Sequence, residues 1–263
     1  MIDKGTAVFV PVRLKSRRLK NKALKKIGNE SSISWCIKNC LKFNGAEHII
    51  LLTSTLKEDL PLTKLKFTKK VKIFKGHPVN LFKRFLDAAK KFKVKTIIRV
   101  TGDCPFVSSE IINFLFKEHR NKQADFTAAR KCAVGTSAEI IEVSALNKMY
   151  KYIKSYNYSE YMKIFFTDNP KYFKNNIVKL PKKLVRNYRL TLDYLEDLKM
   201  FNRLYIEIKK RKIKFNIFNI FKILDRNKLI RQINDKKELL YVSRAFKKQI
   251  AKFTKIKKAI AYN

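Results

Sequence analysis

The sequence is short of acidic residues, cysteine and glycine. Its 263 residues include 21 Asp and Glu against 61 Lys and Arg, four cysteines and six glycines, and the formal net charge is +40. Cys36 and Cys40 fall in one expected helix and Cys104 and Cys132 stand alone, so neither a disulfide framework nor a zinc spacing is present. The three histidines form no metal-binding motif. A reducing compartment is therefore expected, without a histidine or cysteine metal site.

Long hydrophobic runs are missing as well. No apolar stretch reaches the roughly 18 residues of a membrane-spanning helix, and the N-terminus has no signal-peptide core. A cytoplasmic protein without a membrane partner is therefore expected. The hydrophobic fraction of 46% is nonetheless sufficient for the core of one sizeable domain.

The excess of positive charge raises the question of nucleic acid. A basic surface binds phosphate polymers nonspecifically and in a strongly salt-dependent way. Here the lysines are spread along the whole chain, with no RNA-binding signature and no basic amphipathic helix of clear register. We therefore expect no specific nucleic-acid partner, although a nonenzymatic basic binding protein stays open as an alternative.

Segments of strand and helix length alternate along the chain. Strands are predicted at residues 7–12, 48–53, 71–74, 96–100, 126–130, 139–143, 176–180 and 188–193, and helices at 33–43, 81–92, 108–120, 144–152, 158–166 and 195–210. This alternation predicts an α/β fold with a mostly parallel, covered sheet. Residues 1–235 form one expected domain, in which 126–180 depart from the alternation as a small insertion, and residues 236–263 form a Lys-rich tail that is helical or mobile.

The first predicted strand opens onto a loop rich in cations. The strand ends near Pro11, and the loop carries Arg13, Ser16, Arg18 and Lys22. Arg supplies bidentate donors that are always charged, and Lys supplies a mobile point charge. In open α/β sheets, ligands bind outside the carboxyl ends of the strands. The loop is therefore predicted to hold a triphosphate and to neutralise a departing pyrophosphate, although a solvated basic loop would contain the same residues.

Two acidic residues lie at the ends of two other predicted strands. Asp103 follows the strand 96–100 and comes directly after Gly102, which lets backbone approach a ligand. Asp193 ends the strand 188–193. Mg²⁺ prefers few carboxylates together with waters and substrate phosphate oxygens. Asp103 and Asp193 are thus predicted to meet at one sheet edge and hold Mg²⁺, the alternative being an ordinary Asx turn at Asp103.

Five groups of residues share their order and spacing with the motifs of one enzyme family. They are Pro11, Arg13, Ser16, Arg18, Leu19 and Lys22; Gly76, Asn80, Arg84 and Phe85; Gly102, Asp103 and Pro105; Gly135 and Glu139; and Arg189, Leu190, Thr191, Asp193, Glu196, Asp197 and Leu198. In these residues the chain resembles the cytidylyltransferases that activate acidic sugars, as in CMP-KDO and CMP-sialate synthesis, and especially the spore-coat polysaccharide biosynthesis F type. The resemblance covers roughly residues 5 to 235.

The resemblance implies a fold, a reaction and a set of residue roles. The fold is a Rossmann-like, three-layer nucleotidyltransferase (GT-A-like) fold. The reaction is transfer of CMP from CTP to an acidic sugar of the KDO, sialate or legionaminate kind, with release of pyrophosphate, for cell-surface polysaccharide synthesis. A homodimer is implied, with acceptor and dimer contacts in the insertion.

The roles follow the matched positions. The implied catalytic residues are Arg13, Arg18, Lys22 and Asp103; the implied nucleotide-binding residues are Pro11, Arg13, Ser16, Arg18, Lys22, Asn80, Arg84 and Gly102; the implied acceptor-binding residues are Glu139 and Glu160; and Asp103 and Asp193 hold Mg²⁺.

The acceptor side departs from the family pattern. Residues 159–163 read Ser-Glu-Tyr-Met-Lys where much of the family has Arg-Glu-His, and Ser137 stands where Asp is frequent. A sugar different from that of the best-known members is therefore expected, and the sequence does not name it. A glycosyltransferase with a similar sheet is a further alternative, although that class usually carries an Asp-x-Asp motif where this chain has Asp103-Cys104-Pro105.

Overall fold

The computed structural model describes residues 2–153, 155–236 and 244–256. The strands are β1 (Asp3–Pro11), β2 (Lys26–Ile27), β3 (Glu30–Ser31), β4 (Ala46–Ser54), β5 (Val71–Gly76), β6 (Thr96–Arg99), β7 (Phe126–Ala129), β8 (Glu139–Glu142) and β9 (Asn175–Val178). The α-helices are α1 (Ser32–Leu41), α2 (Leu60–Thr63), α3 (Leu81–Lys91), α4 (Ser109–Lys122), α5 (Val143–Tyr152), α6 (Met162–Thr167), α7 (Leu195–Lys210), α8 (Ile217–Arg226), α9 (Lys228–Arg231) and α10 (Arg244–Thr254). Short 3-10 turns are η1 (Lys22–Leu24), η2 (Lys57–Asp59), η3 (Ser159–Tyr161) and η4 (Lys182–Leu184).

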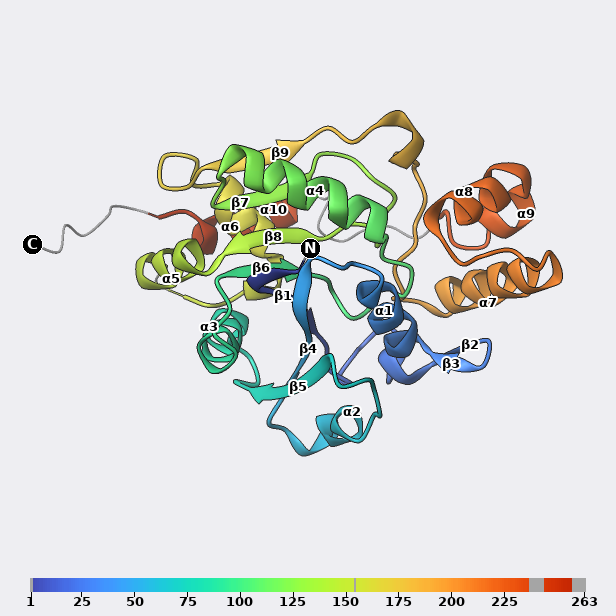
Figure 1. Cartoon of the computed structure of the whole chain (residues 1–263), viewed down its shortest axis with the longest axis horizontal. Coiled ribbons are helices and arrows are strands. Elements are labelled where there is room, and N and C mark those ends of the chain that lie inside the picture. The colour runs from blue at the N-terminus through green and yellow to red at the C-terminus, as the bar shows by residue number, and fades with distance from the viewer. Residues whose placement is uncertain (1, 154, 237–243, 257–263) are drawn as a thin grey trace, which may run out of the picture.

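A seven-stranded sheet forms the middle layer, in the order β5-β4-β1-β6-β8-β7-β9 (Figure 1). All its neighbouring strands are parallel except where β8 pairs with β6 and β7. The predicted mostly parallel α/β fold is confirmed. Because six strands point the same way, the loops after β1, β4, β6 and β7 meet at one edge of the sheet.

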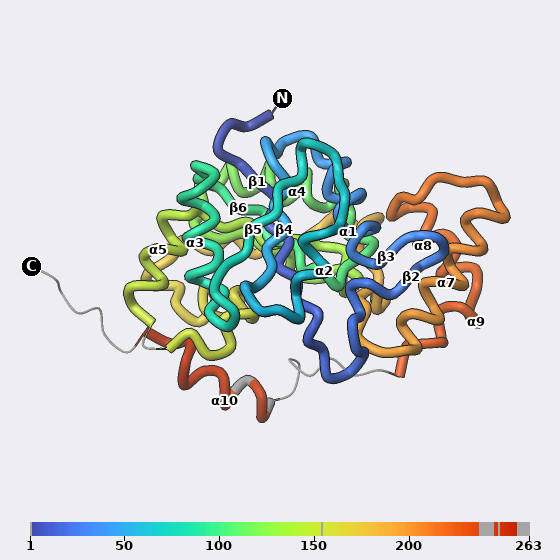
Figure 2. The backbone as a smooth tube through the Cα atoms, turned by 90° about the horizontal axis from the view of Figure 1, so that it is seen from below, coloured from blue at the N-terminus to red at the C-terminus, as the bar shows by residue number. Residues whose placement is uncertain are grey.

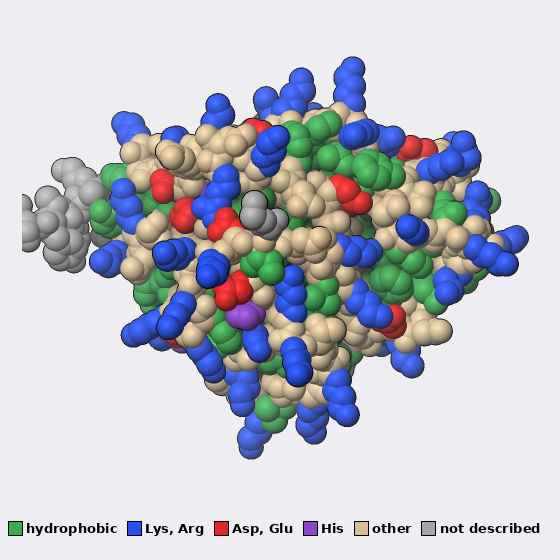
Figure 3. Space-filling model, in the orientation of Figure 1, with side chains coloured by type: hydrophobic (Ala, Val, Ile, Leu, Met, Phe, Trp, Pro, Cys, Tyr) green, Lys and Arg blue, Asp and Glu red, His purple; other side chains and the backbone are tan. Residues whose placement is uncertain are grey.

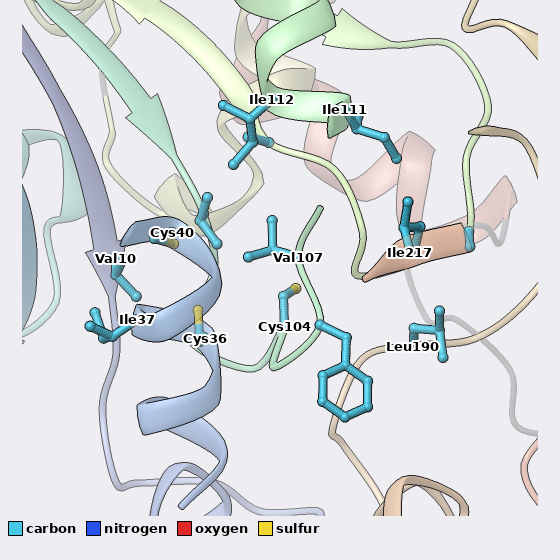
Figure 4. Packing of buried hydrophobic residues seen from close by; sticks show 14 of the residues in the cluster. Val10, Cys36, Ile37, Cys40, Cys104, Val107, Ile111, Ile112, Leu190 and Ile217 are labelled. Atoms are coloured by element: carbon cyan, nitrogen blue, oxygen red, sulfur yellow. The ribbon is translucent and has the colours of Figure 1, made fainter. Parts of the chain in front are cut away.

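The central strand β1 is buried on both faces, as expected where helices cover both sides of a sheet. Val8 and Val10 face the core beneath α1, α4 and α7, whereas Ala7 and Phe9 face the core beneath α3, α5 and α6. Figure 4 shows part of the first core, where Val10 of β1 lies near Ile37 of α1. The thiols of this core are therefore packing groups within the apolar layer, as their burial indicates.

One predicted strand, at residues 188–193, is wrong. This segment forms no strand and makes one isolated parallel bridge, between Val134 and Arg189. The backbone N–H of Leu190 donates to the Val134 carbonyl at 2.7 Å, and that of Leu192 donates to the Asp103 carbonyl at 2.8 Å. The segment is therefore bonded to loops at the carboxyl edge of the sheet, and its alternating pattern reflects burial of Leu190 and Leu192 within the core there.

Residues 126–180 contribute three strands, β7, β8 and β9, to the same sheet. The helices α5 and α6 of this segment pack on the face that α3 also covers. The helix α10 is bonded to the residues just after α6, where Asn169 donates to the Thr254 carbonyl, and in Figure 2 both α10 and the loop after β1 lie along the lower edge of the molecule. The proposed role of this segment in acceptor and dimer contacts stays a prediction.

Among the described residues, no helix is long and apolar enough to span a membrane.

Candidate nucleotide and metal site

The candidate site lies at the carboxyl edge of the sheet, between the loops that follow β1 and β6. These loops run close together, because the N–H of Gly102 donates to the Pro11 carbonyl at 3.1 Å. A Cβ on Gly102 would lie 2.8 Å from Cβ of Val12 and 3.1 Å from the Pro11 oxygen. Glycine is therefore needed for this close approach, which brings the next residue, Asp103, beside the first loop.

Four charged side chains meet at this edge. Nζ of Lys22 donates to Oδ2 of Asp103 at 2.7 Å and to Oδ1 of Asp193 at 2.8 Å. Nη2 of Arg18 donates to the same Oδ1 of Asp193 at 2.6 Å. The side chain of Asp103 is 25% exposed and that of Asp193 is 8% exposed. The two acids therefore meet, as the sequence predicts, and their role as metal ligands stays a prediction.

Asp193 is held in place by a buried ion-pair network. Nη2 of Arg189 donates to Oδ2 of Asp193 at 2.9 Å, and Nε of Arg189 donates to Asp197 at 2.8 Å. The Asp197 carboxylate also accepts from the backbone N–H of Asp193 and from the side-chain amide of Asn234, each at 2.8 Å. Because Arg189 binds Oδ2, the other oxygen of Asp193 is the one that Lys22 and Arg18 contact.

These interactions keep Asp103 and Lys22 ionised. Burial alone would raise the pKa of Asp103, but the charge of Lys22 and its hydrogen bond lower that pKa to about 2. Burial alone would lower the pKa of Lys22, but the charges of Asp103 and Asp193 raise it above its ordinary value. At neutral pH Asp103 is therefore a carboxylate and Lys22 is its ammonium partner.

Gly135 allows the segment before Asp193 to cross this edge. Its φ is +88°, in the left-handed region, and a Cβ there would lie 2.2 Å from the carbonyl oxygen of Leu190. The neighbouring Val134 carbonyl accepts from the N–H of Leu190. The resemblance motif that contains Gly135 therefore has a structural cause, because a side chain would separate the two segments.

The loop after β1 is fixed at its start. The N–H of Leu14 donates to Oδ1 of the buried Asp59 at 2.7 Å, and Nη1 of the exposed Arg13 donates to the Pro78 carbonyl at 2.7 Å. Ser16 Oγ accepts from a backbone N–H within the loop at 3.4 Å. Arg13 is therefore accessible, and the hydrogen bond that holds it is to the backbone of the loop after β5.

Arg84 and Asn80 are buried and fix the loop after β5. Nε and Nη2 of Arg84 donate to the His77 carbonyl at 2.9 and 2.6 Å. Oδ1 of Asn80 accepts from Lys83 N at 3.0 Å and caps α3. Burial first, and then the charge of Arg13, lower the pKa of Arg84 to about 10. Both residues thus support the loop that Arg13 contacts, and direct contact with nucleotide stays a prediction.

Arg99 joins the two residues that were predicted for the acceptor side. Its Nη1 donates to the Glu139 carboxylate at 2.7 Å, and its Nη2 donates to the backbone carbonyl of Glu160 at 2.6 Å. Nε of Arg99 is buried with no hydrogen-bond partner among the described residues. Glu139 and the Glu160 backbone therefore belong to one cluster, built on a strand that neighbours β1.

Two further residues on this side, Tyr161 and Lys163, belong to the segment 159–163 that departs from the family pattern, and the sequence predicts no role for either of them. Burial and the charge of Glu160 raise the pKa of Tyr161. The charge of Arg18 acts to lower this pKa and that of Asp193 to raise it. Nζ of Lys163 donates to the carbonyl of Ala129, at the carboxyl end of β7, at 3.1 Å. Tyr161 and Lys163 thus lie at the same edge as the charged cluster.

The donor set fits a hard divalent cation. Lys22 Nζ lies within 2.8 Å of both carboxylates, so Asp103 and Asp193 converge on one point where positive charge is already held. A site with two carboxylates leaves the remaining positions to waters and phosphate oxygens, as Mg²⁺ prefers. Within the described parts of the chain, no group of three or more His, Cys, Asp or Glu residues that could hold a metal is found.

An open, mostly parallel sheet with cations and carboxylates at its carboxyl edge is an arrangement suited to a nucleotidyltransferase. Residues 7–221 match the family model described as Cytidylyltransferase. The chain belongs to the cytidylyltransferase family and is an enzyme whose reaction is CTP-using transfer.

Known proteins of similar sequence cover most of the chain. An uncharacterised protein of Methanocaldococcus jannaschii is 31% identical over 229 residues, which is 86% of this chain and 93% of that protein. The spore coat polysaccharide biosynthesis protein SpsF of Bacillus subtilis is 22% identical over 210 residues, which is 77% of this chain and 87% of that protein.

Solved structures show the same fold. A cytidylyltransferase from Leptospira borgpetersenii serovar Hardjo-bovis matches with a TM-score of 0.78 and 22% identity, over 89% of this chain and 98% of that one. A CMP-2-keto-3-deoxy-manno-octonic acid synthetase complexed with CTP matches with a TM-score of 0.59 and 11% identity, over 78% of this chain and 99% of that one. The predicted nucleotidyltransferase fold is thereby confirmed.

Proposed function

We propose that the protein transfers CMP from CTP to an acidic sugar and releases pyrophosphate. The observation that carries this proposal is the cluster of Lys22, Arg18, Asp103 and Asp193, in which cations and carboxylates converge at the edge where α/β sheets bind ligands. The sugar hydroxyl oxygen forms a bond to the α-phosphorus, the bond from that phosphorus to the bridging oxygen breaks, and the hydroxyl proton leaves to water. Positioning and charge neutralisation are what such a displacement needs.

Arg13, Arg18 and Lys22 bind the triphosphate in this proposal. Arg18 is about a third exposed and Arg13 is exposed, so both can turn toward phosphate oxygens without unfolding the loop. Lys22 would move from the carboxylates toward the β- and γ-phosphates and stabilise the charge that grows on the departing pyrophosphate. Gly102 and Pro11 would border the nucleotide, with Ser16, Asn80 and Arg84 holding the loops around it.

Asp103 and Asp193 hold the divalent cation, which we propose to be Mg²⁺. When bound, the metal neutralises phosphate charge and polarises the α-phosphate. Arg189 contributes by keeping Oδ2 of Asp193 engaged, so that Oδ1 stays directed at the metal position.

An acidic sugar agrees with the charges on the acceptor side. Lys163 is in α6, and its ammonium reaches the carboxyl end of β7, where it donates to the Ala129 carbonyl. We assign Lys163 to the sugar carboxylate, and Glu139 and Glu160 to the hydroxyl groups of the sugar. The names of two similar proteins, a spore coat polysaccharide biosynthesis protein and a synthetase that acts on an octonic acid, support an acidic sugar used for polysaccharide synthesis.

A cytoplasmic homodimer remains part of the proposal on the resemblance alone, and light scattering of the purified chain tests the dimer.

A pyrophosphate-release assay tests the proposed function. The purified protein is incubated with Mg²⁺, one of the four nucleoside triphosphates, and a panel of sugar acids alongside neutral sugars of matched length. We expect release with CTP and at least one sugar acid, and loss of that release when CTP is replaced by ATP, GTP or UTP.

A substitution of Lys163, with a control at another lysine, tests the assignment of Lys163 to the sugar carboxylate. Lys163→Met should raise the KM for the sugar acid about tenfold while leaving the KM for CTP within about twofold, because it removes one charge–charge contact. Lys171→Met, a change of an exposed lysine beyond α6, serves as the matched control. Release that is equally fast with neutral sugars would count against an acidic acceptor.

A further inference from the structure

The C-terminal helix α10 lies outside residues 7–221, which the family model matches, yet it packs against the acceptor side of the site. The ring of Phe246 lies 4.9 Å from that of Tyr161 and 5.9 Å from that of Tyr158, between centroids. Phe253, seven residues further on, lies 5.3 Å from Tyr158. One apolar face of α10 therefore covers Tyr158, which precedes η3, and Tyr161, which is the last residue of η3.

Polar contacts fix the ends of this packing. Nε2 of Gln249 donates to the hydroxyl of Tyr158 at 2.7 Å. At the other end, the buried Asn169 donates to the Thr254 carbonyl at 2.6 Å and accepts from the N–H of Ile256 at 2.9 Å. Thr254 also donates to the carboxylate of Asp168. The helix is thus bound to both ends of the segment 158–169.

The backbone of Tyr158 has a conformation that its surroundings must stabilise. Its φ is +62°, in the left-handed region, which a bulky residue rarely occupies unless its surroundings hold it there. The described contacts that surround its side chain come from Phe246, Gln249 and Phe253 of α10 and from the nearby Tyr161. The turn that begins η3 therefore depends on α10 for its conformation.

The same turn is joined to the candidate site. Ser159 Oγ accepts from the N–H of Leu81 at 3.2 Å, and the Glu160 carbonyl accepts from Arg99 at 2.6 Å. The side chain of Tyr161, which α10 covers through Phe246, lies close enough to the charged cluster to sense Asp193. A displacement of the turn would move Glu160 and Tyr161 together.

We propose that α10 is a positioning element for acceptor binding, which holds Tyr158 in its left-handed conformation and so sets the placement of Glu160 and Tyr161. Acceptor selection in this chain then depends on a segment beyond the part that defines the family. The inference rests on the proposed function for the identity of the acceptor, but the packing it describes is testable without any acceptor.

Hydrogen exchange of the full-length protein tests the packing. Phe246→Ala should speed exchange of amides in residues 158–169 by about tenfold or more, because local opening follows the loss of packing contacts with Tyr158 and Tyr161. Phe246→Leu should restore most of the protection, and Lys252→Ala, on the exposed side of α10, should leave it unchanged. Gln249→Ala, a change at an exposed position, should also speed exchange in residues 158–169, although by a smaller factor. This variant replaces Phe246→Ala as the test if Phe246→Ala does not fold.

Ligand binding by the same variants tests the functional part. Affinity for CTP with Mg²⁺ should stay within about twofold of wild type, and the KM for whichever sugar acid supports pyrophosphate release should rise about tenfold. Unchanged exchange in 158–169, or a parallel loss of CTP affinity, would overturn the proposal. If wild type releases no pyrophosphate with any sugar acid, the proposed function fails, and the exchange result still decides whether α10 holds the turn.

Discussion

The ammonium of Lys22 lies 2.7 Å from Oδ2 of Asp103. The same ammonium lies 2.8 Å from Asp193, so a protein cation occupies the point on which both proposed metal ligands converge. Metal and Lys22 therefore compete for the two carboxylates, and the triphosphate provides the alternative partner for Lys22.

This competition predicts opposite effects of one substitution. Lys22→Met should raise the affinity for Mn²⁺ about tenfold without nucleotide, because a neighbouring positive charge is removed, and lower the affinity for CTP about tenfold. Paramagnetic resonance of free Mn²⁺ and calorimetry with CTP measure the two effects. Lys20→Met, at an exposed lysine of the same loop, is the control and should change neither. Weaker Mn²⁺ binding by Lys22→Met would contradict the competition.

The two carboxylates should differ in what they contribute to stability. Asp103→Asn and Asp193→Asn should each lower turnover by about a hundredfold or more, because each removes a proposed metal ligand. Asp103 is 25% exposed and its neutralisation leaves Lys22 paired with Asp193, but Lys22 lowers its pKa to about 2, so Asp103→Asn should lower the free energy of unfolding of the protein by about 1–2 kcal/mol. Asp193 is 8% exposed and pairs with Arg189, so Asp193→Asn should cost about 2–3 kcal/mol.

Urea unfolding of the two variants checks this difference. Wild-type turnover in Asp103→Asn would remove the metal assignment. Equal loss of stability in both variants would instead mean that the ion pair of Asp193 with Arg189, which also pairs with Asp197, adds nothing to the free energy of unfolding.

The pH dependence of metal binding follows from two shifted groups. The pKa of Asp103 is lowered to about 2, so its carboxylate is charged above about pH 4 and becomes protonated only as the pH falls toward 2. The pKa of Lys22 is raised, so its ammonium stays charged well above neutral pH. We therefore expect Mn²⁺ affinity to change by less than about threefold between pH 5 and pH 9. A tenfold loss between pH 7 and pH 5 would show that a ligand carboxylate titrates well above the ordinary Asp range, because an Asp of ordinary pKa is still almost fully charged at pH 5.

Gly135 supplies a test of how the site is built. Gly135→Ala should cost about 3 kcal/mol or more, because φ is +88° and the added Cβ would lie 2.2 Å from the Leu190 oxygen. Gly5 is the matched control, since its φ is +80° but a Cβ there would meet only Lys95 side-chain atoms, at 3.4 Å or more. Gly5→Ala should cost about 1 kcal/mol, from the left-handed conformation alone. Equal losses in thermal unfolding would mean that the contact with Leu190 can relax.

Short-range patterns in the sequence predicted much of this fold. The apolar run of β1 and the amphipathic period of α7 identify those elements, and α7 begins and ends at the predicted residues, Leu195 and Lys210. Residues 188–193 were predicted wrongly because alternation reports burial, and a buried loop at a sheet edge alternates as a strand does. Spacing and resemblance predicted that Asp103 and Asp193 lie together, and both do contact Lys22, but the partner of each carboxylate depends on tertiary structure.

The supporting residues were harder to predict. The sequence did indicate a role for Arg99, because a charged residue inside an otherwise apolar buried strand needs a partner. The distant contacts of Asp59 with Leu14, and of α10 with Tyr158, left no local pattern in the sequence. Contacts between segments far apart in the chain are the part of the site that single-sequence reasoning does not reach.

The last prediction concerns the formal net charge of +40. Figure 3 shows Lys and Arg side chains over the whole visible face, with no single concentrated patch. Binding to duplex DNA or RNA should therefore be weak and indifferent to sequence, and should be largely lost between about 50 and 200 mM salt. Affinity for CTP with Mg²⁺ should fall only modestly over that range, because the partly buried Lys22 and the fixed Asp193 are screened less than exposed lysines. Parallel titrations of a labelled duplex and of CTP measure both. Tight, sequence-selective duplex binding that persists at the higher salt would show a nucleic-acid site, whereas an equal loss of CTP affinity would place the triphosphate on the exposed surface.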